Sequence, residues 1–205
     1  MRSPDLEAGH GRTLLELARR SMEHGLVHHE ALPVHLDALP PALAEPAATF
    51  TTLRLHGELR GCCGTLEASR PLATDVAWSA FRAAYRDPRF DPVREDEVDV
   101  VRLEVSVLSA PEPLPVTGEA DLLGKLVPGI DGLVIDDGGQ RATFLPKVWE
   151  SLPEPRMFLA ALKTKCGLPA DYWSDRFRFE RYRATTCSEA DTAGAAQPAS
   201  VTYAG

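Results

Sequence analysis

The sequence predicts an α+β fold, a mixed, largely antiparallel sheet with packed helices, and two candidate hairpins support this prediction. Residues 48–67 contain two β-rich runs on either side of His56-Gly57, and residues 132–146 contain two short runs around an Asp-Gly-Gly turn. Both patterns are typical of β-hairpins, because glycine accepts the positive φ that a tight turn needs. Hairpins that alternate with helices, without regular βαβ units, favour α+β over a parallel α/β architecture.

Apolar spacing predicts the helices that accompany these hairpins. Residues 12–24 repeat apolar side chains at near-helical intervals, and Gly25 offers a stop. A second helix begins at Pro71 and ends before Asp87-Pro88, because the residue before a proline avoids the helical region. These two segments are the N-terminal helical part of the predicted fold.

The remaining elements follow from shorter patterns. Residues 98–108 alternate apolar and polar side chains in their second half, as a half-buried strand does. A third helix is expected over about 155–166, and residues 176–183 form a further strand. The proline-rich connection from Gly25 to Pro46 leaves room for one short helix near 36–39.

Composition limits the class of protein and its partners. The chain has 205 residues and a formal net charge of −8, without a block of consecutive basic residues. This sign disfavours nucleic acid and anionic membranes as partners. No segment resembles a signal peptide or a membrane span, so a cytoplasmic location is expected. The four cysteines are then expected to be reduced thiols.

The expected domain organisation is one α+β domain over residues 1–183, followed by a disordered polar tail over 184–205. From about Ala184 the chain is rich in alanine, serine, threonine and glycine, with little to bury. No motif with the spacing of a phosphate loop, a dinucleotide fingerprint or a zinc site is present. We therefore expect no cofactor and no metal bound through cysteines and histidines.

The segment Leu-Arg-Gly-Cys-Cys-Gly carries the strongest chemical signal in the chain. In a strand, Arg60 and Cys62 point to one face and Cys63 points to the other. Glycine in a strand marks a bulge or a close approach, so the glycines beside the cysteines are expected to open space there. A guanidinium near a thiol favours the reactive thiolate. The alternative is that both cysteines pack and that Arg60 pairs with a carboxylate.

This segment brings the sequence close to a known family. The chain resembles the AMMECR-type domain family, called AmmeMemoRadiSam system protein A in prokaryotes, over about residues 12–182. The likeness rests on the order and spacing of several motifs, at residues 59–65, 87–90, 103–114, 129–135, 142–149 and 158–173. In the family pattern an apolar residue stands where this chain has Cys63, which identifies Cys62 as the family cysteine.

The resemblance implies a larger and a smaller subdomain around a cleft, and an association with a Memo-like protein and a radical-SAM protein. It does not supply a reaction. One hypothesis is therefore an accessory or binding protein that works with these partners and with an unknown small molecule. The other is a thiol-dependent enzyme in which Cys62 is a nucleophile or a modified residue.

The enzyme hypothesis needs polar groups that orient a substrate near Cys62. The candidates besides Arg60 are Glu104, on the polar face of its strand, and Lys165, at the end of a helix. Glu104 could equally be a solvated carboxylate, and Lys165 a cation that stabilises the helix C-terminus. We expect Cys62 to face a cleft or the surface near Arg60 and Cys63 to pack in the core. If Cys62 is functional, the charge of Arg60 is expected to lower the pKa of its thiol below that of a free cysteine.

Overall fold

The computed structural model describes residues 8–189 and 200–202, and these form two compact units. The larger unit comprises the chain up to Ala110 together with the segment from Thr185 onward, and the smaller unit comprises Pro111–Ala184. Helices and antiparallel strand pairs occur in both units, which confirms the predicted α+β class. The strands are divided between two sheets, with five strands in one and four in the other.

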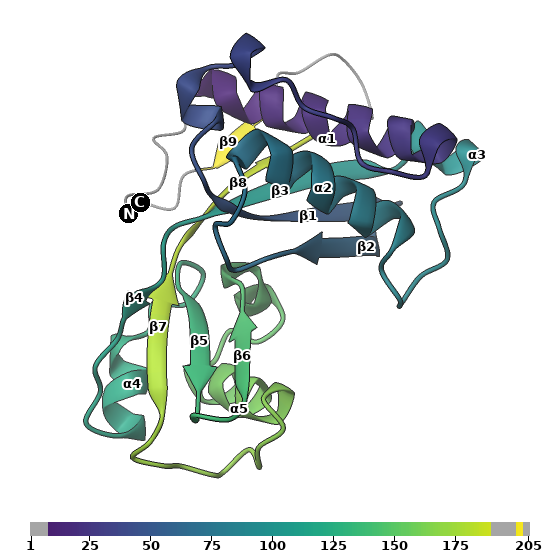
Figure 1. The fold of residues 1–205 in the computed structure, drawn as a ribbon. Coiled ribbons are helices and arrows are strands. Elements are labelled where there is room, and N and C mark those ends of the chain that lie inside the picture. Colours follow the sequence, from purple (N-terminus) through teal and green to yellow (C-terminus); the bar gives the residue numbers. More distant parts are fainter. Residues whose placement is uncertain (1–7, 190–199, 203–205) are drawn as a thin grey trace. The chain divides into compact units, whose positions relative to one another are not determined.

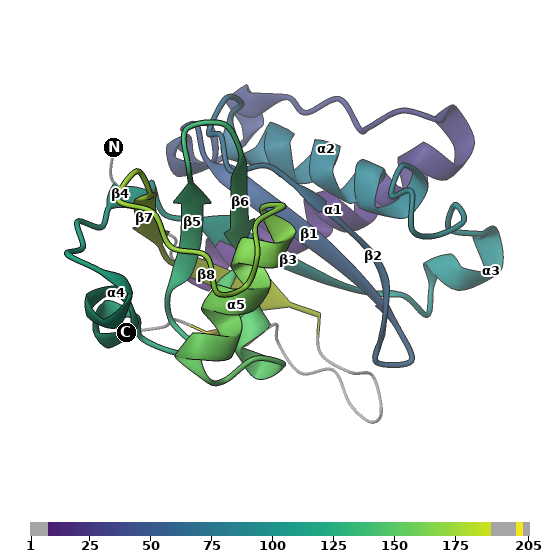
Figure 2. The same cartoon turned by 90° about the horizontal axis from the view of Figure 1, so that it is seen from below.

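The sheet of the larger unit has the strand order β2-β1-β3-β8-β9 (Figures 1 and 2). Its strands are β1 (Ala48–Leu55), β2 (Glu58–Gly64), β3 (Arg102–Leu108), β8 (Ala184–Ser188) and β9 (Ser200–Thr202). β1 pairs antiparallel with both β2 and β3, so β2 is an edge strand. The predicted turn between β1 and β2 is confirmed, because His56 and Gly57 have φ values of 53° and 87°.

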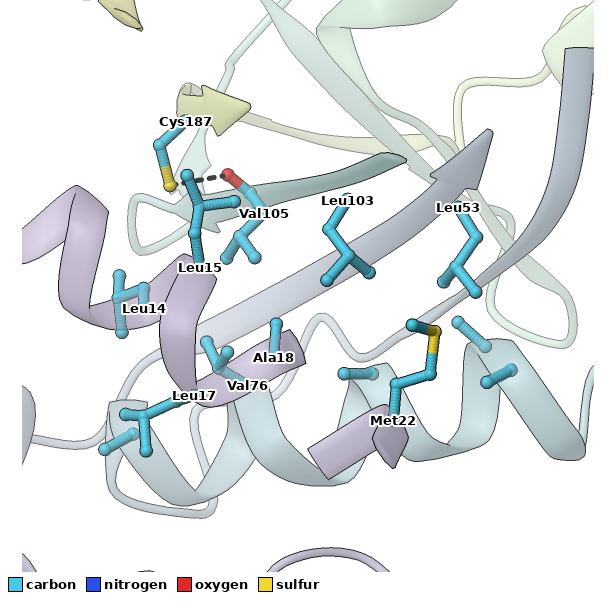
Figure 3. Close-up of a cluster of buried hydrophobic side chains, with 14 of the residues drawn as sticks. Leu14, Leu15, Leu17, Ala18, Met22, Leu53, Val76, Leu103, Val105 and Cys187 are labelled. Carbon is cyan, nitrogen blue, oxygen red and sulfur yellow. Dashed lines mark hydrogen bonds between the residues drawn. The ribbon is translucent and has the colours of Figure 1, made fainter. Parts of the chain in front are cut away.

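Two helices cover one face of this sheet, α1 (Ala8–His28) and α2 (Leu72–Tyr85) (Figure 1). Their apolar stripes meet those of the strands, because side chains at helical spacing share one face and alternate strand residues share another. The resulting core contains Leu14, Leu17, Ala18 and Met22 of α1, Val76 of α2, and Leu53, Leu103 and Val105 of the sheet (Figure 3). The residues from α1, α2 and β3 belong to the apolar stripes and the alternating strand that the sequence predicted.

Gly25 does not end the first helix, contrary to the prediction. The helix continues to His28, and a Cβ atom at Gly25 would lie 2.6 Å from Phe81 and 2.7 Å from Tyr85. The glycine is needed because α2 approaches α1 closely at this turn. The helix instead ends at His29, whose φ of 59° is left-handed.

Shorter helices connect the main elements of the larger unit. The short helix expected near 36–39 is present as the 3-10 turn η1 (Leu36–Ala38), and η2 (Pro41–Leu43) follows it. The strand predicted to start at 98 starts at Arg102, because the preceding residues form α3 (Glu95–Val98). This helix contains Glu97, whose carboxylate forms an ion pair with Arg60 of β2, the strand that also carries Cys62.

The smaller unit has a sheet of order β4-β7-β5-β6, drawn with its helices in Figures 1 and 2. Its elements are β4 (Glu112–Pro113), α4 (Glu119–Lys125), β5 (Gly132–Asp136), β6 (Arg141–Phe144), η3 (Pro146–Glu150), α5 (Pro155–Lys165) and β7 (Arg178–Tyr182). The predicted hairpin, third helix and final strand are therefore confirmed. The rings of Trp149 and Phe158 stack in its core at a centroid distance of 3.8 Å.

The prediction that a disordered polar tail begins at Ala184 is wrong for residues 184–188. Residues 184–188 form β8, and Cys187 is buried in the core of the larger unit with a relative exposure of 4%. Glu189 then forms an ion pair with Arg19 of α1. The prediction failed because alternating polar residues of a central strand resemble a tail in composition. The rest of the expected tail, apart from β9, lies outside the described residues.

Candidate functional site

The strand pairing sets Cys62, Thr52 and Glu104 side by side. Cys62 of β2 lies opposite Thr52 of β1, and Thr52 lies opposite Glu104 of β3. Residues that are directly opposite in antiparallel strands project to the same face of a sheet. These three side chains, named the Cys62 row from here on, therefore form one line across three strands.

The Cys62 row lies on the sheet face that points away from α2. Thr51, one position before Thr52, has its hydroxyl 2.7 Å from the hydroxyl of Ser79 on α2, so Thr51 points toward that helix. Cys63 lies opposite Thr51 and packs against the hydrophobic core, as predicted. Because neighbouring strand residues alternate between faces, Cys62 points the other way.

The glycines beside the two cysteines permit close approach of other backbone segments and do not open free space. A Cβ atom at Gly61 would overlap the carbonyl oxygen of Ala83 on α2. One at Gly64 would overlap the carbonyl oxygen of Thr49 on the neighbouring strand. The expectation of an open region beside Cys62 is therefore wrong, and both glycines are explained by backbone packing.

The free edge of β2 is closed at Cys62 by an aspartate–arginine pair. Asp87 Oδ2 accepts a hydrogen bond from the backbone N–H of Cys62 at 2.8 Å, and Arg89 Nη2 donates to the carbonyl oxygen of Cys62 at 3.4 Å. Arg89 also donates to both carboxylate oxygens of Asp87, at 2.9 and 2.7 Å. The pair thus satisfies backbone groups that an edge strand would otherwise leave unpaired.

The charge of Arg89 stabilises the ionised form of Asp87. Hydrogen bonds from the Arg89 guanidinium, helped by the N–H groups of Cys62 and Arg89, lower the pKa of Asp87 to about 2. The side chain of Asp87 is almost fully buried, whereas that of Arg89 is 55% exposed. The carboxylate is therefore charged at neutral pH and holds the Cys62 backbone in place.

The surroundings of the Cys62 thiol favour its neutral form. Burial is the largest influence and raises the pKa of Cys62; a hydrogen bond from the Thr52 hydroxyl, 3.6 Å from Sγ, and the charge of Arg89 oppose it only in part. The prediction of a lowered pKa is wrong in direction. A thiolate loses hydration when it is buried, and the nearby guanidinium of Arg89 is hydrogen-bonded to the carboxylate of Asp87.

Arg60 is not the cation that acts on Cys62. Its guanidinium donates to both carboxylate oxygens of Glu97 at 2.9 Å and to the backbone carbonyl oxygens of Asp91 and Pro92. This contact lowers the pKa of Glu97 to about 2. The pairing register shifts between Leu53 and Arg54, opposite Arg60, so simple alternation does not predict where that side chain points. Arg60 thus pairs with a carboxylate, the alternative left open above.

The two remaining predicted residues lie in different units. Glu104 is half-buried in the Cys62 row. Lys165 is the last residue of α5 in the smaller unit, where Nζ donates to the carbonyl oxygen of Thr143 at 2.9 Å and lies 5.2 Å from the centre of the Phe144 ring. A role for either residue in chemistry stays a prediction.

A comparison of sequences decides which family this fold and site belong to. The sequence model of the AMMECR1 family matches residues 15–187 of the chain. The chain belongs to the AMMECR1 family. The match includes the strands of the Cys62 row, the Asp87–Arg89 pair and all of the smaller unit, which confirms the resemblance inferred from the motifs.

Two proteins and one crystal structure from archaea are similar to this AMMECR1 protein. A protein of Methanothermobacter thermautotrophicus is 36% identical over 190 residues, which cover 90% of this chain and 96% of the relative. Protein MJ0810 of Methanocaldococcus jannaschii is 35% identical over 167 residues, 78% of this chain and 81% of the relative. The crystal structure of the uncharacterized protein PH0010 from Pyrococcus horikoshii superposes with a TM-score of 0.84 at 32% identity, and covers 94% of this chain and 96% of that one.

Sequence reasoning missed three residues of this AMMECR1 site: Thr52, Asp87 and Arg89. Asp87 and Arg89 belong to the Asp-Pro-Arg-Phe motif that supported the resemblance, but the motif was interpreted only as a helix stop. Two charged residues of opposite sign directly after a helix were the available signal. Thr52 carried no signal, because a threonine in a β-rich run is expected for its strand propensity alone.

The AMMECR1 site offers hydrogen-bonding groups and no ready metal centre. Over residues 8–189 and 200–202, no three or more histidine, cysteine, aspartate or glutamate side chains lie together so that they could hold a metal ion. No helix in the same part of the chain is long and apolar enough to cross a membrane. The Cys62 row can offer a neutral thiol, a hydroxyl and a carboxylate on a rigid sheet.

Proposed function

We propose that this protein is an accessory binding protein of the system that pairs AMMECR1-type proteins with Memo-like and radical-SAM proteins. The proposal includes a polar small molecule as the ligand of the Cys62 row. The observation that carries it is the Cys62 row itself, a thiol, a hydroxyl and a carboxylate in one line on one sheet face. Burial raises the pKa of the Cys62 thiol in this row. A thiol that is neutral at physiological pH is a weak nucleophile and a usable hydrogen-bonding group.

The rigidity of the row supports a binding role. The backbone of Cys62 is held on one side by β1 and on the other by Asp87 and Arg89. Thr52 is hydrogen-bonded to the thiol, and its strand lies between β2 and β3. Side chains fixed in this way lose little conformational entropy when a ligand binds, which favours affinity.

Mixing experiments test the partner part of the proposal. The purified protein should form a complex with the Memo-like or the radical-SAM protein of the same organism, detected by size-exclusion chromatography with light scattering. A complex that persists in Thr52→Val and Cys62→Ala variants would place the partner surface away from the row. No complex with either protein at micromolar concentrations would contradict the assignment to this system.

Mass spectrometry of co-purified small molecules tests the ligand part. Protein isolated under native conditions should release a polar compound, and the Thr52→Val and Cys62→Ala variants should retain less of it. Cys166→Ala is the matched control, because Cys166 is buried in the core of the smaller unit. Equal retention by all variants would exclude the row as the ligand site.

The thiol-dependent enzyme is the second candidate function, and one pair of contacts favours it. The Thr52 hydroxyl and the charge of Arg89 both stabilise a Cys62 thiolate, although burial outweighs them. In such an enzyme Sγ would give its proton to water and add to a double-bonded, electrophilic carbon of the substrate, so that the π bond breaks and its electron pair moves to the neighbouring atom as the S–C bond forms. Fast, selective alkylation of Cys62 at neutral pH would favour this candidate over the binding protein.

A further inference from the structure

The exposed charges of residues 68–90, the segment that includes α2, are all positive. The segment contains four arginines and two aspartates, a formal charge of +2 in a chain whose net charge is −8. Both aspartates, Asp75 and Asp87, are buried. The charges that another molecule can reach on this part of the surface therefore belong to arginines.

Trp78 orders two of these arginines. The Trp78 ring is half-buried, and the guanidinium carbons of Arg70 and Arg82 lie 4.2 and 4.8 Å from its centre. Trp78 and Arg82 are four residues apart in α2, so they share one face of the helix. A guanidinium that stacks on an aromatic ring keeps the N–H donors in its own plane available. Stacking therefore restrains the arginine and leaves its donors free to bind.

Two arginines of the segment have such donors at the surface. Arg82 and Arg86 are exposed, and neither side chain forms a hydrogen bond or an ion pair with any residue that the structure describes. The two other arginines of the segment are paired with the buried aspartates. Arg82 and Arg86 can thus bind an anionic group of another molecule without breaking a contact within the described part of the chain.

We propose that Trp78, Arg82 and Arg86 form a surface that binds an acidic segment of a partner protein. A carboxylate accepts two parallel hydrogen bonds from one guanidinium, and the free donors of these arginines match that geometry. Arginine and tryptophan are also the residue types that contribute most to binding at protein interfaces. The inference rests on the partner part of the proposed function, because it names the surface that such a partner contacts.

The charge of the whole chain favours an acidic protein segment over nucleic acid. A short run of carboxylates carries few charges, and the two free arginines can pair with them. The closely spaced phosphates of a nucleic acid extend beyond such a small surface and would be repelled by a chain of net charge −8.

A short fluorescein-labelled polyglutamate peptide serves as the probe, and a polyglutamine peptide of the same length is its neutral control. Fluorescence anisotropy measures the binding of each peptide to the full-length protein. We expect polyglutamate to bind and polyglutamine not to bind. The affinity for polyglutamate should fall as the salt concentration rises, because salt screens exposed charges.

Variants distinguish this surface from a general effect of charge. Arg82→Glu should weaken polyglutamate binding about tenfold, because it replaces an attraction by a repulsion. Trp78→Leu should weaken it about threefold, since Arg82 loses the ring that restrains it. Arg156→Glu is the matched control: Arg156 is an exposed arginine of α5 in the smaller unit, so the variant changes the net charge equally and should leave binding unchanged. Thermal unfolding checks that each variant is folded.

Three results would overturn the proposal. Equal weakening by Arg82→Glu and Arg156→Glu would mean that the peptide responds to net charge alone. Tighter binding of single-stranded oligothymidylate than of polyglutamate through the same arginines would assign the surface to nucleic acid. A complex with the Memo-like or radical-SAM protein that survives Arg82→Glu and Arg86→Glu would contradict this surface and leave the proposed function intact. Peptide binding through Arg82 without any such complex would support the surface and contradict only the assignment to that system.

Discussion

Asp87 holds Cys62 through the backbone and not through the thiol: its carboxylate accepts the Cys62 N–H at 2.8 Å, and Arg89 completes the contact on the carbonyl side. The backbone of Cys62 is therefore held in position by the Asp87–Arg89 ion pair. The position of the thiol depends on the edge of a sheet, so changes at that edge should affect both stability and thiol reactivity.

Replacement of Asp87 by asparagine should destabilise the fold by about 2 kcal/mol, because a buried charged acceptor of several hydrogen bonds is lost. Urea unfolding at pH 7 measures this. The control is Asp96→Asn, which removes an exposed ion pair with Arg94 and should leave stability nearly unchanged, because water and salt screen such a pair. Equal stability of Asp87→Asn and the wild type would show that the edge contact is dispensable.

The stabilisation by Asp87 should also depend on pH in a defined direction. Its pKa in the folded protein is about 2, below the value of about 3.9 expected in the unfolded chain. The contribution is therefore complete above pH 4 and is lost as the pH falls through about 2. The difference in unfolding free energy between the wild type and Asp87→Asn should shrink over that range, and a difference that stays constant would contradict the assignment.

Alkylation of Cys62 followed against pH should titrate above the free-cysteine value of about 8.5, because burial raises its pKa. Arg89→Met should move the profile further upward, since it removes the cation that opposes burial. Arg60→Met should leave the profile where it is, because Arg60 pairs with Glu97. Peptide mass spectrometry assigns the label to Cys62. A profile that responds to Arg60 and ignores Arg89 would restore the original hypothesis.

Two helical glycines should respond in opposite ways to the same substitution. Gly25→Ala should destabilise the protein by about 2 kcal/mol, because the new Cβ would press against Phe81 and Tyr85. Gly124→Ala, in α4, meets no atom within 4 Å and should stabilise by about 0.5 kcal/mol through helix propensity. Thermal unfolding measures both. A stabilising Gly25→Ala would mean that α1 and α2 can separate freely at this point.

Asp75 should give the opposite pH dependence to Asp87. Its buried carboxyl accepts hydrogen bonds from Thr49 and Arg70, yet burial outweighs them and raises its pKa. The folded state then holds the proton more tightly, so this contribution is complete below about pH 4 and is lost as the pH rises through the raised pKa. The stability of the wild type relative to Asp75→Asn should therefore fall as the pH rises, and an increase would show that hydrogen bonding dominates.

The sequence alone determined the parts of this protein that depend on local patterns. β-rich runs in residues 48–67 predicted a hairpin, alternation in residues 103–108 predicted a third strand, and apolar spacing predicted the major helices, because each pattern repeats within a few residues. The same alternation separated Cys62 from Cys63 correctly. The motifs identified the family, since their order along the chain is itself sequence information.

Only the tertiary structure decided which groups surround Cys62. Arg60 is two residues away in the chain, but a shift in strand register directs it to Glu97, whereas Arg89 reaches Cys62 from beyond the next helix. The direction of the thiol pKa follows from burial, which is summed over neighbours distant in sequence. The close packing of α1 against α2 likewise explains why residue 25 is a glycine. Contacts of this kind are properties of the folded chain, and no local pattern records them.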